Sequence, residues 1–344
     1  MNIFVAFNDG YALPTKVMLK SLILNNPGPL VIYVFYSSLE QRSIDSVREL
    51  EDGESVFFRF RKVEDSFLDG IAIPPQFSKE TYYRLLAHHL FNEDIEKVLW
   101  LDGDLIINGP LSDFYEQDFH GKLYIAVEDF NSRFLHAKRV ALKMPPDAAY
   151  INSGVMLFNL KDAQKTLNDE EIVQYLADNQ DVLEYADQDV FNGLLHEHIL
   201  IVDPEHRYNY FAEYITIKNR KSVCQNARVI HFCGERKPWK KDFYNPGFSL
   251  WWKYAWKTGP EYRARYLGLL LSHLRARPKK NIDFRNTWLD PKYVIWRFKL
   301  FSKRILPGPY FFLKRLYDRA AGKQSKEESL HDIFSRKTKR RVDP

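Results

Sequence analysis

The sequence predicts an α/β protein whose mainly parallel sheet is flanked by helices. Short apolar runs of strand length alternate with helix-like segments along residues 1–231. This alternation is typical of a doubly wound sheet, in which helices cross over between parallel strands. Apolar residues make up 45% of the 344-residue chain, which allows a substantial core and excludes a disordered protein.

The expected strands are the apolar runs themselves, because a strand buried on both faces is apolar throughout. They lie at 3–7, 30–35, 56–60, 98–101, 123–127, 154–160, 199–202 and 227–231. We expect one helix from Pro14, a residue favoured in the first helical turn, to Asn25. Two more are expected at 39–50 and 81–91.

The composition changes near residue 258, which divides the chain into three expected parts. Residues 275–344 carry 20 Lys and Arg against 7 Asp and Glu, whereas residues 1–274 carry 30 against 38. We therefore expect a catalytic α/β domain at 1–258 and a small, basic, aromatic and helical appendage at 259–318. The polar residues 319–344 are expected to be disordered.

The appendage has the pattern of a helix that lies at a membrane interface. Residues 284–317 hold ten aromatic side chains among interleaved basic residues. Between 292 and 305, apolar side chains share one face of the expected helix, and the lysines lie away from that face. We expect docking on an anionic membrane surface, in preference to packing on the body or a partner, and we expect no nucleic-acid partner.

The expected location is the cytoplasm, with peripheral attachment to the inner face of the cytoplasmic membrane. No basic segment precedes an apolar one at the start of the sequence, and no run of 18 apolar residues occurs. Cys224 and Cys233 cannot form a disulfide framework and are expected to be reduced.

Asp102-Gly103-Asp104 follows the apolar run at 98–101 and is the strongest chemical signal. Side chains at positions i and i+2 of an extended segment point the same way, so both carboxylates can reach one divalent cation. Ligands of open α/β sheets bind beyond the carboxyl ends of the strands. Gly103 leaves room for a ligand near the backbone. The alternative is a solvated Asp-Gly turn.

His231 ends another apolar run and could complete the same metal site. Imidazole together with carboxylates suits Mn²⁺ or a similar ion. Lys237, a little further on, could pair with a phosphate. The alternative for His231 is a hydrogen-bonded core histidine, and the alternative for Lys237 is a surface lysine.

Three further polar groups are candidates for binding a sugar. Asn152 precedes an apolar strand and can both donate to and accept from hydroxyl groups. Asp187 and Asp189 flank Gln188, and carboxylates near an anomeric carbon can stabilise an oxocarbenium-like centre. Asp187 could equally be a helix N-cap, and Arg84 could be a surface charge.

Together and in chain order, these motifs resemble glycosyltransferase family 8, which includes bacterial lipopolysaccharide galactosyl- and glucosyltransferases and the glycogenins. The matching segments span residues 1 to about 250: VAFNDGY, YYRL, VLWLDGDLII, VEDF, YINSGVMLFNL, DQDVFNGL and VIHFCGERKPW. The resemblance implies a Rossmann-like GT-A fold, a UDP-sugar donor, a Mn²⁺ cofactor with Mg²⁺ as the other candidate, and retention of anomeric configuration.

The resemblance also implies roles for individual residues. The metal ligands would be Asp102, Asp104 and His231. The uridine pocket would be lined by Ala6, Asn8 and Tyr11. The donor sugar would be surrounded by Arg84, Asp129, Asn152, Asp187 and Gln188, of which Asp129, Asp187 and Gln188 are the catalytic candidates. The diphosphate would be held by Gly234 and Lys237, close to Asp102 and Gly103.

One departure from the family pattern lies near the N-terminus. Family members often show two acidic residues before the aromatic one, as in DDNY, whereas this chain has Asn8-Asp9-Gly10-Tyr11. Asn8 can still accept a hydrogen bond from the uracil N–H, but Gly10 brings no side chain to the ribose.

The expected activity is transfer of glucose or galactose from a UDP-sugar to a glycan or lipid-linked acceptor near the membrane. Gln188 is a poor nucleophile because an amide oxygen is neutral. We therefore favour same-face attack by the acceptor over a covalent intermediate. The alternative is a non-catalytic nucleotide-sugar- or glycan-binding protein on the same fold. A nucleotidyltransferase is disfavoured, because the N-terminal segment is not a Gly-rich, basic phosphate loop.

Overall fold

The computed structural model describes residues 1–91, 95–131, 135–216, 218–240 and 245–275. The chain divides into two compact units, Met1–Thr258 and Gly259–Pro344. The second unit is described only in its first helix, α11 (Pro260–Arg275). The expected interfacial helix at 292–305 and the expected disordered tail at 319–344 lie outside the described residues.

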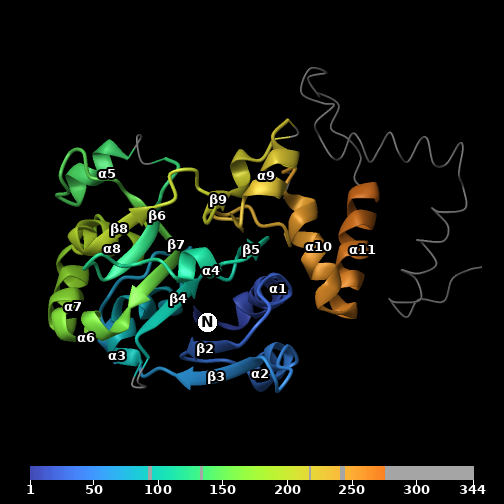
Figure 1. Cartoon of the computed structure of the whole chain (residues 1–344), viewed down its shortest axis with the longest axis horizontal. Helices are drawn as coiled ribbons and strands as arrows, with labels where there is room; N and C mark the ends of the chain where they lie inside the picture. Colours follow the sequence, from blue (N-terminus) through green and yellow to red (C-terminus); the bar gives the residue numbers. More distant parts are fainter. Residues whose placement is uncertain (92–94, 132–134, 217, 241–244, 276–344) are drawn as a thin grey trace, which may run out of the picture. The chain divides into compact units, whose positions relative to one another are not determined.

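A seven-stranded sheet forms the centre of the first unit (Figure 1). The strand order is β3-β2-β1-β4-β7-β6-β8, and only the pairs that β7 makes, with β4 and β6, are antiparallel. The prediction of a mainly parallel sheet flanked by helices is confirmed. The strands are β1 (Asn2–Ala6), β2 (Leu30–Tyr36), β3 (Val56–Lys62), β4 (Lys97–Leu101), β6 (Tyr124–Glu128), β7 (Ile151–Asn159) and β8 (Ile199–Val202).

A second, three-stranded sheet contains the last expected strand. Its order is β5 (Leu105–Ile107), β10 (Val229–His231) and β9 (Tyr210–Phe211). β10 runs antiparallel to β5 and pairs His231 with Leu105. This register places the end of β10 beside the residue that precedes β5, which is Asp104.

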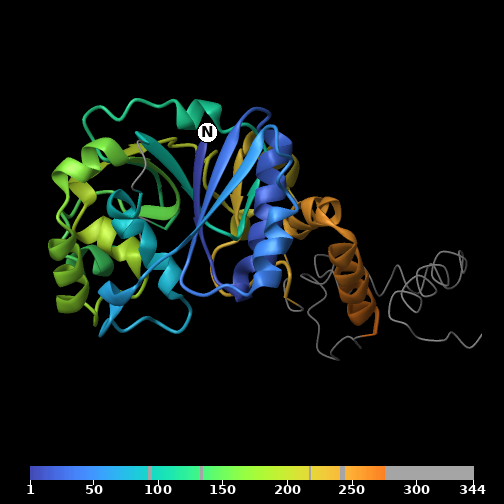
Figure 2. The same ribbon diagram turned by 90° about the horizontal axis from the view of Figure 1, so that it is seen from below.

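Helices cover the main sheet on both faces. In Figure 2 the long blue helix, α1, lies on one side of the strands, and the green helices of residues 160–193 lie on the other. The α-helices of the first unit are α1 (Asp9–Asn25), α2 (Gln41–Arg48), α3 (Ala87–Leu90), α4 (Ser112–Tyr115), α5 (His136–Ala141), α6 (Leu160–Thr166), α7 (Asp169–Asp178), α8 (Asp187–Gly193), α9 (Arg220–Asn226) and α10 (Phe248–Thr258). Among the described residues, the 3₁₀ helices are η1 (Ser66–Leu68), η2 (Lys79–Leu86), η4 (His196–His198) and η5 (Ala212–Tyr214).

Two of the expected helices differ from the prediction. Helix α1 begins at Asp9 and not at Pro14, because the Asn8 side chain accepts a hydrogen bond from the Gly10 N–H and caps the helix five residues earlier. The expected helix at 81–91 is a 3₁₀ helix, η2, followed by the single α-helical turn of α3. Tyr82, Tyr83 and Arg84 are all buried, although consecutive residues of a 3₁₀ helix point in different directions, so this segment is enclosed on more than one side.

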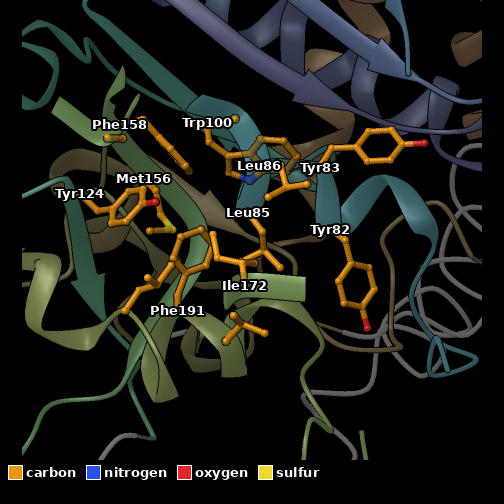
Figure 3. Close-up of a cluster of buried hydrophobic side chains, with 14 of the residues drawn as sticks. Tyr82, Tyr83, Leu85, Leu86, Trp100, Tyr124, Met156, Phe158, Ile172 and Phe191 are labelled. Atoms are coloured by element: carbon orange, nitrogen blue, oxygen red, sulfur yellow. The ribbon is translucent and has the colours of Figure 1, made fainter. Parts of the chain in front are cut away.

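The core consists of two hydrophobic clusters on the two faces of the sheet. Along β1, Phe4 belongs to one cluster while Ile3 and Val5 belong to the other, as the two-residue period of a strand requires. Figure 3 shows the first cluster, where Phe158 of β7 lies near Trp100, Tyr124 and Phe191. The second cluster packs the sheet against α1 and β5.

Among the described residues, no helix combines the length and the apolar character that a membrane span requires. Cys224 and Cys233 are both free, as expected.

Phe158→Ala tests the contribution of the first cluster to stability. The ring of Phe158 is 1% exposed and its centroid lies 5.0 Å from that of Tyr124. Removing it leaves a cavity, so we expect the free energy of unfolding to fall by about 3–5 kcal/mol, measured by urea titration. Val140→Ala is the control, since Val140 is 65% exposed and its replacement should change stability by less than about 0.5 kcal/mol. Equal losses in the two variants would contradict this account of the core.

Candidate active site

Two carboxylates and one imidazole converge where β4 turns into β5. One ligand atom from each of Asp102, Asp104 and His231 lies within 4.8 Å of the other two. His231 Nε2 is 3.2 Å from Asp104 Oδ1 and 3.8 Å from Asp102 Oδ2. The pairing of β10 with β5 produces this arrangement, and the Phe232 N–H donates to the Asp104 backbone carbonyl at 3.0 Å.

The residues present fit a divalent cation. Two carboxylates and a neutral imidazole are a donor set that Mn²⁺ accepts, and Mg²⁺ also takes carboxylate ligands. Asp104 and His231 are buried, whereas the Asp102 side chain keeps 23% of its surface exposed. Of the three candidate ligands, Asp102 is therefore the most accessible to solvent.

Lys237 forms a buried ion pair with Asp104. Its Nζ lies 2.5 Å from Asp104 Oδ2 and donates to the Phe232 carbonyl at 2.8 Å. Burial acts to raise the pKa of Asp104, but Lys237 and His231 outweigh it and hold that pKa below its usual value. Likewise, burial acts to lower the pKa of Lys237, and Asp104 more than reverses this. Both side chains stay charged, so Lys237 is not the surface lysine of the alternative interpretation.

Arg84 of η2 connects the metal candidates to the sugar-binding candidates. Its guanidinium donates to Asp102 Oδ1 at 2.9 Å and to the Ser153 carbonyl at 2.6 Å. Its Nε lies 2.6 Å from Asp187 Oδ2, and its Cζ lies 4.3 Å from the centroid of the Trp100 ring. Arg84 is buried, so it is not a surface charge.

Asp187 is the first residue of α8 and faces the interior. The N-cap position belongs to Ala186, which has a left-handed φ of 53°, so the N-cap interpretation of Asp187 is wrong. Burial raises the pKa of Asp187 to about 7, against the opposing attraction of Arg84. The strained backbone before α8 aims this carboxyl group at Arg84.

A bulge in β7 presents polar groups to the site. The register between β6 and β7 shifts at Ala126/Val127, so that Ala126 pairs with Met156 and Val127 pairs with Asn152. Bulges of this kind re-aim side chains next to active sites. Asn152 Nδ2 donates to Gln188 Oε1 at 2.9 Å, and Asn152 Oδ1 accepts from Asn209 Nδ2 at 2.8 Å.

Asp129 lies at the end of β6, near the same amides. Its Oδ1 accepts a hydrogen bond from the Asn131 N–H at 2.7 Å. Burial raises its pKa, while the Asn131 N–H, His231 and Asn152 act in the opposite direction. The structure thus brings together four of the residues expected to bind the donor sugar: Asp129, Asn152, Asp187 and Gln188. Their roles stay predictions.

The three residues of the expected uridine pocket lie at the end of β1 and the start of α1. Ala6 is the last residue of β1, and Asn8 caps α1 through the oxygen that was expected to face uracil. Tyr11 is 37% exposed, and its ring centroid lies 6.0 Å from that of Trp239. Burial raises the Tyr11 pKa to about 12.

Glycine is required at positions 103 and 234 of the expected site for two different structural reasons. A side chain at Gly103 would place its Cβ 2.3 Å from Thr15 Oγ1, so α1 already occupies the space that was expected to admit a ligand. Gly234 has a φ of 77°, a left-handed conformation that glycine adopts without strain, and it is exposed. Its contact with a diphosphate stays a prediction.

Sequence reasoning missed three residues that shape the site. Trp100 donates from Nε1 to Asp102 Oδ1 at 2.8 Å, and its position two residues before Asp102 could have indicated this. Ser153 supplies the carbonyl that Arg84 binds. Asn209 joins His231 to Asn152, and the isolated amide in Tyr208-Asn209-Tyr210 gave no local signal of it.

The fold and this site define a glycosyltransferase of the GT-A type. The chain belongs to glycosyl transferase family 8, whose family model matches residues 2–242. The resemblance seen in the sequence motifs is therefore confirmed.

Comparison with individual proteins agrees with this membership. The chain is 24% identical over 299 residues to a lipopolysaccharide 1,2-glucosyltransferase of Escherichia coli K12, covering 79% of this chain and 86% of the relative. It is 22% identical over 316 residues to a lipopolysaccharide 1,3-galactosyltransferase of Salmonella typhimurium LT2, covering 87% and 90%. The fold matches a crystal structure of the galactosyltransferase LgtC in complex with donor and acceptor sugar analogs, with a TM-score of 0.67 and 24% identity over 77% of this chain and 100% of that one.

Lys237→Met tests the buried ion pair. The variant leaves the Asp104 carboxylate buried without its main positive partner, so we expect a loss of about 3–5 kcal/mol in the free energy of unfolding. A divalent cation would replace part of the missing charge. Added Mn²⁺ should therefore raise the melting temperature of Lys237→Met by more than that of the native chain.

Lys221→Met is the control for this prediction, because Lys221 is exposed. We expect it to change stability by less than about 0.5 kcal/mol and to respond to Mn²⁺ like the native chain. A Lys237→Met variant as stable as this control would refute the account of the pair.

Proposed function

We propose that this chain is a metal-dependent, retaining hexosyltransferase that uses a UDP-sugar donor. Glucose and galactose are the favoured sugars, because the named lipopolysaccharide relatives transfer one or the other. The proposed acceptor is a glycan or a lipid-linked saccharide. The observation that carries the proposal is the cluster of Asp102, Asp104 and His231, which a protein that only binds sugars would not need.

The proposed metal is Mn²⁺, with Mg²⁺ as the other candidate, held by these three side chains. Bound there, it would supply Lewis-acid stabilisation to the oxygens of the departing diphosphate. Lys237 adds a fixed positive charge beside Asp104, and a buried charge acts more strongly than one in water. Asp102, Gly103 and Gly234 would contact the same diphosphate, while Ala6, Asn8 and Tyr11 would line the uridine pocket.

The donor-sugar pocket would be formed by Arg84, Asp129, Asn152, Asp187 and Gln188. Gln188 Oε1 accepts from both Asn152 Nδ2 at 2.9 Å and the Ser153 N–H at 3.2 Å. Both acceptor positions of a neutral amide oxygen are thus used, which argues against Gln188 as a covalent nucleophile. We therefore propose same-face attack by the acceptor, with Gln188, Asp129 and Asp187 stabilising the positive anomeric centre.

Release of UDP from UDP-glucose and UDP-galactose tests the proposal. We expect release with at least one donor in the presence of Mn²⁺ and its loss on chelation with EDTA. Asp104→Asn should lower turnover by about 100-fold or more, because a neutral amide is a weaker metal ligand and removes electrostatic stabilisation of the leaving group.

Asp113→Asn serves as the matched control, since Asp113 is an exposed aspartate outside the cluster. It should retain native turnover. Near-native turnover in Asp104→Asn would remove the metal hypothesis. Binding of UDP-sugars without any UDP release would favour a non-catalytic binding protein.

The basic region at 259–318 supports a second proposal, that the enzyme works at the cytoplasmic membrane. Its excess of Lys and Arg and its Trp and Tyr residues favour the headgroup layer of an anionic bilayer. We propose a cytoplasmic protein attached peripherally to the inner membrane face.

Liposome flotation tests the attachment. The full chain should float with vesicles that contain phosphatidylglycerol, and flotation should weaken with salt, because the attraction is electrostatic. A chain that ends near residue 270 should stay at the bottom of the gradient. Equal flotation of the two chains would count against docking through this region.

A further inference from the structure

Two backbone N–H groups of β7 determine how the amide side chains of the site are oriented. The Gly154 N–H donates to Asn152 Oδ1 at 3.0 Å, and the Ser153 N–H donates to Gln188 Oε1 at 3.2 Å. A backbone N–H can only donate, so the amide oxygens, and not the amide nitrogens, must face it. The orientation of Asn152 and of Gln188 is therefore fixed by the main chain.

Asn209 receives its orientation from Asn152. It is 1% exposed and lies just before β9. Asn152 Oδ1 can only accept, so the group that Asn209 presents to it at 2.8 Å must be the donor Nδ2. The opposite atom, Asn209 Oδ1, then faces His231 Nδ1 at 3.0 Å.

This contact determines the tautomer of His231. Since an amide oxygen only accepts, Nδ1 of the imidazole must carry a hydrogen. With Nδ1 protonated, the lone pair that the imidazole can offer to an ion is on Nε2, the atom that points to Asp104 Oδ1 and Asp102 Oδ2. Without an ion, Nε2 can also carry a hydrogen and donate it to these carboxylates. A neutral Nε2 with a free lone pair is the form that binds a metal ion.

The ring is also held in place from its sides. A Cβ at Gly154 would lie 2.4 Å from His231 Cε1, so the backbone of β7 lies directly against the imidazole. Phe211 of β9 contacts the ring edge to face, with centroids 5.7 Å apart. Asn209 supplies the directional contact that this packing lacks.

We infer that Asn209 is the positioning residue of the metal site. It holds His231 as the Nδ1–H tautomer with Nε2 aimed at the two aspartates, and thereby sets the affinity for a divalent cation. This inference rests on the proposed function, because it presupposes that His231 is a metal ligand. Through Asn152, the same hydrogen-bonded chain continues to Gln188 in the expected donor-sugar pocket.

Titration of the full-length chain with Mn²⁺, followed by electron paramagnetic resonance of the free ion, tests the inference. Asn209→Ala removes the acceptor for Nδ1–H, and we expect the Kd for Mn²⁺ to rise by about 10–100-fold. Asn209→Asp keeps an acceptor at that position, so its Kd should stay within about 3-fold of the native value, although it loses the donor to Asn152. Retention in the aspartate variant separates an orienting role from a merely structural one.

Asn26→Ala is the matched control. Asn26 is also buried and also bonded through both ends of its amide, donating to the Leu22 carbonyl and accepting from the Leu111 N–H, but it lies at the far end of α1. We expect it to lower stability without changing the Kd for Mn²⁺. Native affinity in Asn209→Ala, or equal losses in Asn209→Ala and Asn209→Asp, would overturn the inference.

A second measurement distinguishes failure of the inference from failure of the proposed function. In the metal-free native chain, at a pH where the imidazole is neutral, ¹⁵N NMR of labelled histidine should show His231 with its hydrogen on Nδ1, assigned by the signal lost in His231→Gln. A native chain that shows this tautomer yet binds no Mn²⁺ would sink the proposed metal dependence and keep the orienting role of Asn209. An Nε2–H tautomer would overturn the inference whatever the affinity.

Discussion

The pairing of β10 with β5 is the constraint on which the site depends. It places His231 opposite Leu105, and the Phe232 N–H closes the turn by donating to the Asp104 carbonyl. A carboxylate and an imidazole from distant parts of the chain are thereby buried side by side. Burying the Asp104 carboxylate is costly, and the charge of Lys237 offsets that cost.

Strand β7 is the second organising element, because it is the one antiparallel member of the main sheet. Its bulge brings Asn152, Ser153 and Gly154 to the end of β4, where the Gly154 carbonyl accepts from the Asp102 N–H at 3.0 Å. Backbone groups then orient the amides, and the amides orient the histidine. Asn152 and His231 lie on strands, and side chains carried by strands keep their geometry better than those carried by loops.

Ion pairs hold the carboxyl groups of the site in place. Arg84 lies against Asp102 and Asp187, while Lys237 lies against Asp104. Arg84 also rests on the face of Trp100 and is therefore rigid. The partly exposed Asp102 carboxylate is left at the open side of the cluster, which is where an entering cation and a diphosphate would meet.

The sequence by itself determined the strands of the main sheet, the order of the motifs and the family, because apolar periodicity and short motifs are local properties. Seven strand positions were predicted to within three residues, and the paired aspartates were found from their spacing alone. The start of α1 also depends on a local interaction, the N-cap hydrogen bond of Asn8. Only the tertiary structure decided that β7 runs antiparallel, that β10 leaves the main sheet, that Arg84 and Asp187 are buried, and that Asn209 supports His231. These features depend on hydrogen bonds between residues far apart in the chain, and no periodicity or spacing within one segment carries that information.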